Sequence, residues 1–357
     1  ARTFCNWLCE IFDGSNLCGV PATIRFLGLF DSVASVGLPT SSGVGTDGHA
    51  SWADAPLLRI PAAVKNCVHF VAMHENRGSF PAELVRVAGT LPANCHEYMF
   101  PGMHSDVGGG YKPNQQGRGP TGRDEGKLSL LPLEAMYIAA TTALVPLDKA
   151  LARDGEYDPF KVADNARAAF SAFMADRQKP RRVRDWLFEY LAWRYQMRHT
   201  YMGLAWAARA AAAKGDHEAL RDLAGANQRL LDDVASFEGL AALPPRTLLE
   251  DPGSPEGRAR SRHSVRIGSL EREASEVYEL VRVAPPTKAG AALLFADYCH
   301  DSYAGFRPFD QVKVFGWDPV PGSWEAEGYL RWRRRYEGDD ERLTRHVPIE
   351  QLETSLA

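Results

Sequence analysis

The sequence predicts an α/β fold built on a doubly wound, mostly parallel sheet with a large helical insertion. Up to about residue 145, short apolar runs end at polar or glycine-rich segments, which is typical of buried parallel strands. Helical patterns and loops alternate with these runs. From about residue 146 to about residue 245, alanine, arginine and long helical patterns dominate, without a convincing strand pattern.

The elements before residue 145 can be placed in order. The apolar run at residues 24–30 predicts a buried strand that delivers Asp31 at its carboxyl end. A second strand is predicted within residues 60–75, and a third at residues 97–100, which stops at the glycine-rich turn PGMHSDVGGGY. The segment LPLEAMYIAATTAL, residues 131–144, predicts a helix.

The chain of 357 residues is longer than one compact domain usually is, so a core with an insertion is expected. We predict that residues 1–145 belong to the α/β core. Residues 146–290 are predicted to be a helical insertion, a candidate lid or membrane-docking module. Residues 291–357 are predicted to return to the core and to form the C-terminal tail.

Composition excludes several classes of protein. Apolar residues make up 45% and charged residues 24%, which is ordinary for a globular chain, and the net charge of −4 gives no basic footprint for nucleic acid. No apolar stretch approaches the about 20 residues of a membrane-spanning helix. The cysteines predict buried free thiols, with no metal site or other cofactor implied. They are Cys5, Cys9, Cys18, Cys67, Cys95 and Cys299.

Two residues have the placement of a hydrolytic acid and base. Asp31 ends the first predicted strand, and His104 follows the third strand, 73 residues later. A carboxylate that orients an imidazole, and an imidazole that takes a proton from a nucleophile, are the requirements of a catalytic triad. Two structural alternatives remain open, since Asp31 could cap a helix that begins at Ser32 and His104 could be a structural histidine.

The residues after His104 favour a functional turn. Ser105 and Asp106 are candidate supporting residues, and Gly108 and Gly109 allow the backbone to turn tightly and a substrate to come close. Asp106 could orient His104, or it could hold the turn through an Asx-type hydrogen bond.

Several segments resemble a known family. FLGLFDSVASVG and FPGMHSDVGGGY are similar to two signature segments of the α/β-hydrolase domain of type VI secretion phospholipase effectors. HDSYAGF and GYLRWRRRY resemble two further segments, and ARTFCNWL looks like the helix that follows the nucleophile elbow of that family. The resemblance implies an α/β-hydrolase-like fold, with Asp31 as the triad acid and His104 as its base.

The same resemblance implies a serine phospholipase of the A type that acts as an antibacterial toxin on membranes. Such effectors leave the cytoplasm of the producing bacterium for the periplasm of a target cell, and a secretion spike protein and an immunity protein are expected partners. No G-x-S-x-G elbow occurs in the 357 residues. We therefore expect the serine in an upstream segment of the same protein, and this chain alone to be inactive.

His300 and Asp301 can be interpreted in three ways. They could form a second His–Asp pair, although neighbouring residues point in different directions. We favour supporting roles near the wall of the pocket, and purely structural roles remain an alternative.

Membrane contact is predicted for one aromatic stripe. Trp186, Tyr190, Trp193 and Tyr201 recur at helical spacing with arginines among them, a pattern that suits a lipid–water boundary. Alternatively the stripe packs on the core. The basic cluster is interpreted as a solvated helix face; it consists of Arg331, Arg333, Arg334 and Arg335.

Two rival functions remain at this point. One is a non-catalytic interaction module that binds a secretion spike or an immunity protein. The other is a peptidase that uses the same triad.

Overall fold

The computed structural model describes the residue ranges 12–13, 16–17, 20–21, 23–33, 58–77, 80–87, 89–155, 158–175, 183–212, 217–243, 251, 253–267, 271–306, 328–333 and 335–336. The segment ARTFCNWL and residues Cys5, Cys9, Cys18 and Arg334 lie outside the described residues. Cys67, Cys95 and Cys299 are buried and free, as predicted.

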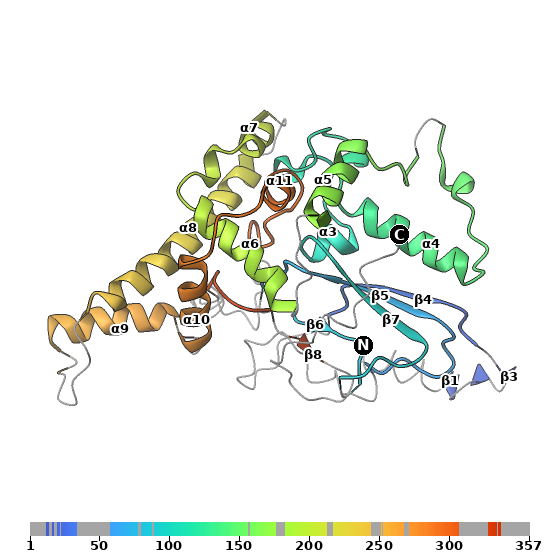
Figure 1. Ribbon diagram of the computed structural model, residues 1–357, viewed down its shortest axis with the longest axis horizontal. Coiled ribbons are helices and arrows are strands. Elements are labelled where there is room, and N and C mark those ends of the chain that lie inside the picture. Colours follow the sequence, from blue (N-terminus) through green and yellow to red (C-terminus); the bar gives the residue numbers. More distant parts are fainter. Residues whose placement is uncertain are drawn as a thin grey trace, which may run out of the picture.

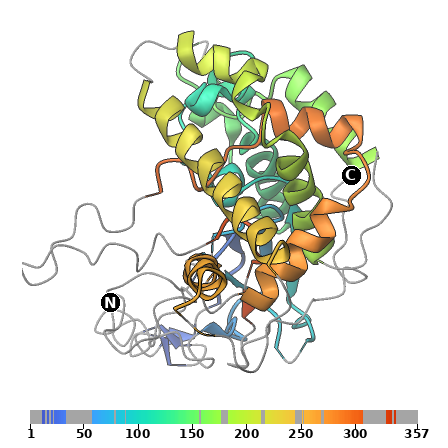
Figure 2. The same ribbon diagram turned by 90° about the vertical axis from the view of Figure 1, so that its left-hand side faces the viewer.

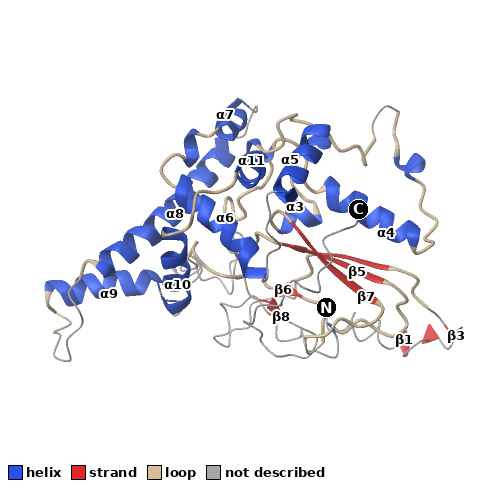
Figure 3. Cartoon of the chain, viewed as in Figure 1, coloured by secondary structure: helices blue, strands red, loops and turns tan. Residues whose placement is uncertain are grey.

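Among the described residues, three parallel strands form the sheet that carries the predicted site. They are β4 (Leu27–Phe30), β5 (Cys67–Ala72) and β7 (Cys95–Phe100), in the order β4-β5-β7. Phe30 pairs with Phe70, and Ala72 pairs with Phe100, so the carboxyl ends of all three strands point toward one edge (Figure 3). The fold is therefore of mixed α/β type with a parallel sheet, as predicted.

Two further pairings are short. β1 (Phe12–Asp13), β2 (Asn16–Leu17) and β3 (Val20–Pro21) form an antiparallel meander. β6 (Ala82–Glu83) pairs in parallel with β8 (Arg335–Tyr336), so residues 335–336 lie beside the segment that follows β5.

The described helices surround the carboxyl edge and one face of the sheet (Figure 1). The α-helices are α3 (His104–Gly108), α4 (Leu130–Thr142), α5 (Asp164–Ala175), α6 (Val183–Met197), α7 (Ala205–Ala212), α8 (His217–Ala241), α9 (Pro255–Ile267), α10 (Glu271–Arg282) and α11 (Ala289–Asp297). Four single 3-10 turns are η1 (Gln115–Gly117), η2 (Asp124–Gly126), η3 (Lys149–Ala152) and η4 (Tyr201–Gly203).

Helix α4 covers the sheet because its apolar face meets the strands. Met136 packs with Val68, Phe70 and Val107 in one cluster. Between residues 146 and 290, all the described elements of secondary structure are helices. Of these, α8 and α9 extend away from the sheet (Figures 1 and 2). None of the described helices is both long and apolar enough to cross a membrane.

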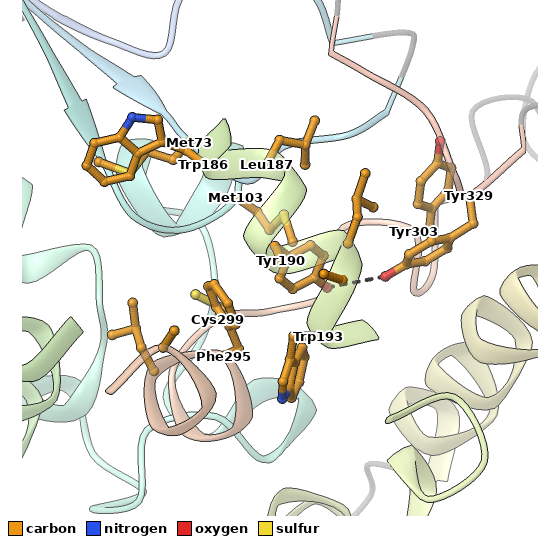
Figure 4. Packing of buried hydrophobic residues seen from close by; sticks show 14 of the residues in the cluster. Met73, Met103, Trp186, Leu187, Tyr190, Trp193, Phe295, Cys299, Tyr303 and Tyr329 are labelled. Carbon is orange, nitrogen blue, oxygen red and sulfur yellow. Dashed lines mark hydrogen bonds between the residues drawn. The ribbon is translucent and has the colours of Figure 1, made fainter. Parts of the chain in front are cut away.

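The main core lies where the strand ends meet the helices, and it contains the predicted lipid-contacting stripe (Figure 4). Trp186, Tyr190, Trp193 and Tyr201 are each at most 2% exposed. Tyr190 and Trp193 pack on Phe295 of α11, with ring centroids 5.4 and 5.5 Å apart. The prediction of membrane contact is wrong for these four residues, because the stripe faces the protein core.

The arginine cluster is also not a solvated helix face. Arg331 and Arg333 are 1% and 7% exposed in an irregular stretch, and Arg335, 5% exposed, is the first residue of β8. Buried guanidinium groups require partners, since an unpaired buried charge is costly. The partners of Arg333 belong to the candidate site.

Candidate active site

Asp31 lies directly after β4, at the carboxyl edge of the sheet. Its backbone N–H donates to the carbonyl oxygen of Phe70 at 2.6 Å, which continues the pairing with β5. The residue adopts a left-handed conformation with φ of 44°, which aspartate tolerates better than most residues, and it is fully buried. Residues 32 and 33 form no helix, so the carboxylate does not act as a helix cap there.

His104 opens α3 and reaches Asp31. Its Nδ1 donates to Asp31 Oδ2 at 2.8 Å, and its side chain is 25% exposed. The predicted glycine-rich turn therefore begins with one helical turn, which ends at Gly108, and the sharp change of direction follows at Gly109, where φ is 84°. Two residues 73 positions apart are brought together because β4 and β7 end at the same edge.

The Asp31 carboxylate accepts four hydrogen bonds from described residues. Oδ1 accepts from Ala72 N and from Arg333 Nη1, each at 2.7 Å, and Oδ2 accepts from Arg333 Nη2 at 2.7 Å as well as from His104. Burial alone would raise the pKa of Asp31, but the charge of Arg333 and the hydrogen bonds from His104 and Arg333 hold it well below its usual range. The group is therefore a carboxylate at neutral pH.

A second buried ion pair lies behind His104. Glu75 Oε2 accepts from the backbone N–H of His104 at 3.2 Å, and Arg77 donates through Nε and Nη2 to the two oxygens of Glu75, each at 3.0 Å. Ser302 Oγ donates to Glu75 Oε1 at 2.9 Å. The pair therefore ties the start of α3 to the loop after β5 and to residues near 300.

Asp106 serves a different histidine from the one predicted. Its Oδ1 accepts from His300 Nδ1 at 2.6 Å and its Oδ2 from His300 N at 3.1 Å, while Tyr111 stacks on the His300 ring at 3.6 Å. Asp106 Oδ2 also accepts from Met103 N at 3.0 Å, which closes the first turn of α3. The alternative in which Asp106 orients His104 is wrong. Its bond to Met103 N is a capping-box contact at the start of α3 and not the Asx-type bond of the glycine turn that the sequence offered as an alternative.

Neither Asp301 nor Ser105 hydrogen-bonds the side chain of Asp31 or of His104 among the described contacts. Asp301 does not pair with His300; its Oδ2 accepts from Tyr329 OH at 2.8 Å and lies 3.4 Å from Arg194 Nη2. Ser105 is half-buried on α3, and its hydroxyl hydrogen-bonds none of the described residues.

Sequence reasoning missed a buried network that supports the backbone beside Asp31. Ser32 N donates to His69 Nε2 at 3.1 Å, so Nδ1 of His69 carries the proton and donates to Glu97 Oε1 at 3.0 Å. Glu97 Oε2 accepts from Arg86 Nε at 3.1 Å. The sequence did contain a signal for this network. His69 and Glu97 are ionisable residues within the strands β5 and β7, and buried ionisable residues need partners.

The pair of Asp31 and His104 can perform general acid–base chemistry. Nδ1 is fixed on the carboxylate, and Nε2 hydrogen-bonds none of the described residues, so it remains available to a reacting group. No group of three metal-ligating side chains occurs among the described residues. A partly open cavity of about 260 Å³ lies among β7, α4 and α5, and its lining contains none of the residues of this pair.

A buried carboxylate that orients a partly exposed imidazole at the carboxyl edge of a parallel sheet is an arrangement that hydrolases of the α/β class use. Residues 11–139, which include both side chains, match the family model "T6SS, Phospholipase effector Tle1-like, catalytic domain". This match confirms the family resemblance found in the sequence, and it makes the chain similar to phospholipase effectors of type VI secretion.

A solved structure that is similar in fold can be compared with the chain. It is the crystal structure of an uncharacterized protein from Pseudomonas aeruginosa, with a TM-score of 0.60 and 24% sequence identity. The similarity covers 94% of this chain and 55% of that protein, so the chain spans about half of its length. No curated protein matches the chain.

Proposed function

We propose that the chain is part of a serine carboxylic ester hydrolase of the phospholipase A type, built on an α/β-hydrolase topology. One observation supports the proposal most strongly: His104 donates to buried Asp31 at 2.8 Å while its Nε2 stays available. Both residues lie in the range that matches a phospholipase effector family.

The chemistry follows from the roles of the two groups. Nε2 of His104 accepts the proton of a serine hydroxyl as the serine oxygen forms a bond to the ester carbonyl carbon. Asp31 stays ionised and stabilises the imidazolium, which then gives the proton to the leaving alcohol as its bond breaks. A water molecule repeats the two proton transfers and releases the fatty acid from the acyl-enzyme.

The nucleophile is proposed to come from a part of the whole protein beyond these 357 residues. No G-x-S-x-G elbow occurs in the sequence, and no described serine hydroxyl hydrogen-bonds His104. The related crystal structure is nearly twice as long as the region it shares with this chain, which leaves room for such a segment.

The biological setting is proposed on the same family match. A type VI effector would be made in the bacterial cytoplasm and delivered to the periplasm of a target cell, where phospholipid is within reach. A secretion spike protein and an immunity protein are the proposed partners. The division into residues 1–145, 146–290 and 291–357 stays a prediction, and a role of the helical part as a lid belongs to this proposal.

The test uses the full-length protein and phospholipid vesicles, with release of fatty acid as the measurement. We expect His104→Ala and Asp31→Asn each to reduce the rate by about 10²- to 10⁴-fold, because general-base catalysis is lost. His199→Ala is the control, since His199 is exposed and makes none of the contacts of the site.

Each rival function predicts a different result. A non-catalytic interaction module would release no fatty acid even as the parent protein. A peptidase would cleave a casein substrate while leaving phospholipid intact. Undiminished hydrolysis by His104→Ala would refute the role of His104.

A further inference from the structure

Arg333 uses all three nitrogens of its guanidinium group beside the proposed acid. Nη1 and Nη2 donate to the two oxygens of Asp31, each at 2.7 Å, so the contact is a two-pronged fork. Nε donates to the carbonyl oxygen of Phe80 at 2.8 Å, and Nη1 also donates to that of Ala72 at 3.1 Å. The guanidinium is thus held by the backbone on one side and holds the carboxylate on the other.

The fork determines the plane of the Asp31 carboxylate. A carboxylate offers about four acceptor positions, and here Arg333 takes one on each oxygen. Ala72 N takes the second position on Oδ1, which leaves the second position on Oδ2 for His104. Rotation of the carboxylate would break both arms of the fork, so the oxygen that faces His104 is fixed.

We propose that Arg333 is a positioning residue of the hydrolytic site, which fixes and charge-balances Asp31 so that the carboxylate holds His104 in place as a base. This inference rests on the function proposed above. Arg333 acts only through Asp31, and no contact of Arg333 with substrate is implied.

The charges around Asp31 support the second half of this role. His104 of α3 faces Oδ2, and the adjacent Glu75 and Arg77, from the loop after β5, form an ion pair with each other. On the other side His69 of β5 is paired with Glu97 of β7. Arg333 is therefore the cation that neutralises Asp31 among the described residues around it.

Removal of this cation should make the site take up a proton more readily. Burial raises the pKa of Asp31, and the charge of Arg333 is the largest influence that lowers it. Without the guanidinium, Asp31 takes up a proton at higher pH, and a neutral carboxyl group no longer stabilises the imidazolium that forms during the reaction. The acidic limb of the rate profile should then move upward.

The experiment compares Arg333→Met and Arg333→Lys in the full-length protein, with fatty-acid release from phosphatidylethanolamine vesicles measured from acidic to alkaline pH. We expect Arg333→Met to lower kcat by about 10²-fold with little change in KM, because an interaction needed for catalysis and not for binding is lost. Its acidic limb should rise by about one pH unit or more. Arg333→Lys should restore the limb, because the charge is kept, but only part of kcat, because the fork is lost.

Arg331→Met is the matched control, because Arg331 is buried in the same segment at 1% exposure. It should cost stability, measured by urea unfolding, without moving the acidic limb. Two results for Arg333→Met would overturn the proposal. One is an acidic limb of the rate profile that does not move. The other is a loss of rate that is explained by a loss of stability, as in the control. If Arg333→Met does not fold, Arg333→Lys provides the test. An Arg333→Lys protein that loses kcat and whose acidic limb also moves to higher pH would contradict a role of the charge.

A spectroscopic measurement separates this inference from the proposed function. In protein labelled with [15N]histidine, the Nδ1–H resonance of His104 is assigned by its loss in His104→Gln. A parent protein that releases no fatty acid would refute the hydrolase proposal and leave this measurement intact. The resonance should lose its hydrogen-bonded downfield shift in Arg333→Met and keep it in Arg331→Met, and an unchanged shift in Arg333→Met would refute the positioning role.

Discussion

Replacing Glu75 by glutamine removes the charge from a fully buried ion pair that holds the start of α3. Glu75 accepts from Arg77 through Nε, Nη2 and the backbone N–H, from Ser302 Oγ and from His104 N. Glutamine has nearly the same shape but can no longer balance the buried guanidinium. Loss of one partner of a buried pair costs about 3–5 kcal/mol, so Glu75→Gln should be less stable than the parent by that amount at pH 7.

The same pair predicts how the difference depends on pH. Burial alone would raise the pKa of Glu75, but the charge and hydrogen bonds of Arg77 lower it from 4.5 to about 2. This change corresponds to about 3 kcal/mol of preferential stabilisation of the folded state. Because the folded pKa is lowered, that contribution is complete above about pH 4.5 and is lost as the pH falls from 4.5 toward 2.

Urea unfolding followed by circular dichroism, at a series of pH values from 7 down to 3, provides the test. The stability difference between parent and Glu75→Gln should shrink steadily below pH 4.5. Glu279→Gln is the control, because Glu279 pairs with Arg282 at the surface, with side chains 55% and 49% exposed, and such pairs contribute little. A difference that stays constant between pH 7 and pH 3 would show that the Glu75 carboxylate is not stabilised in this way.

Two further predictions concern packing. Phe295→Ala should lower the free energy of unfolding by about 3–5 kcal/mol, because the ring is fully buried among Tyr190, Trp193 and Phe173. Leu293→Ala is the control and should change it little, because Leu293 is 45% exposed. Equal effects of the two substitutions in urea unfolding would contradict this description of the core. Gly117→Ala should cost more stability than Gly122→Ala in thermal unfolding. Both glycines have positive φ, but a Cβ at Gly117 would clash with the carbonyl oxygen of Trp206, whereas one at Gly122 would meet nothing within 4 Å. An equal cost would mean that only the backbone strain matters.

The closeness of Asp31 and His104 could be predicted from sequence because each residue follows its own strand. The apolar run before Asp31 and the run before His104 identify two strand ends, and parallel strands place their ends at one edge. The local pattern therefore contained enough information to bring these two residues together.

The partners of the site could not be predicted in the same way. Arg333 lies 302 residues from Asp31, in a run of arginines that has the composition of a solvated surface. Its burial depends on a carboxylate at the other end of the chain, and no local pattern carries that information. Asp106 and His300 are likewise 194 residues apart.

The aromatic stripe shows a second limit. An amphipathic helix with tryptophan and tyrosine has the same spacing whether it faces lipid or the protein core. For Tyr190 and Trp193, the question is settled by α11, which supplies Phe295 from a distant part of the sequence. The spacing thus predicted that one face of the helix is apolar. Only the tertiary packing shows that this face contacts the protein core and not lipid.

The long separation between Asp31 and Arg333 has a consequence for biosynthesis. During translation, Asp31 is made about three hundred residues before its partner Arg333. Until Arg333 has been made, the Asp31 carboxylate cannot be buried beside the cation that balances its charge. Contacts between such remote positions also form slowly, because a large loop must close first. The buried arrangement of Asp31, His104 and Arg333 would then form only once translation has passed Arg333. A product cut short before that residue would keep Asp31 and His104 without the guanidinium that balances the buried carboxylate.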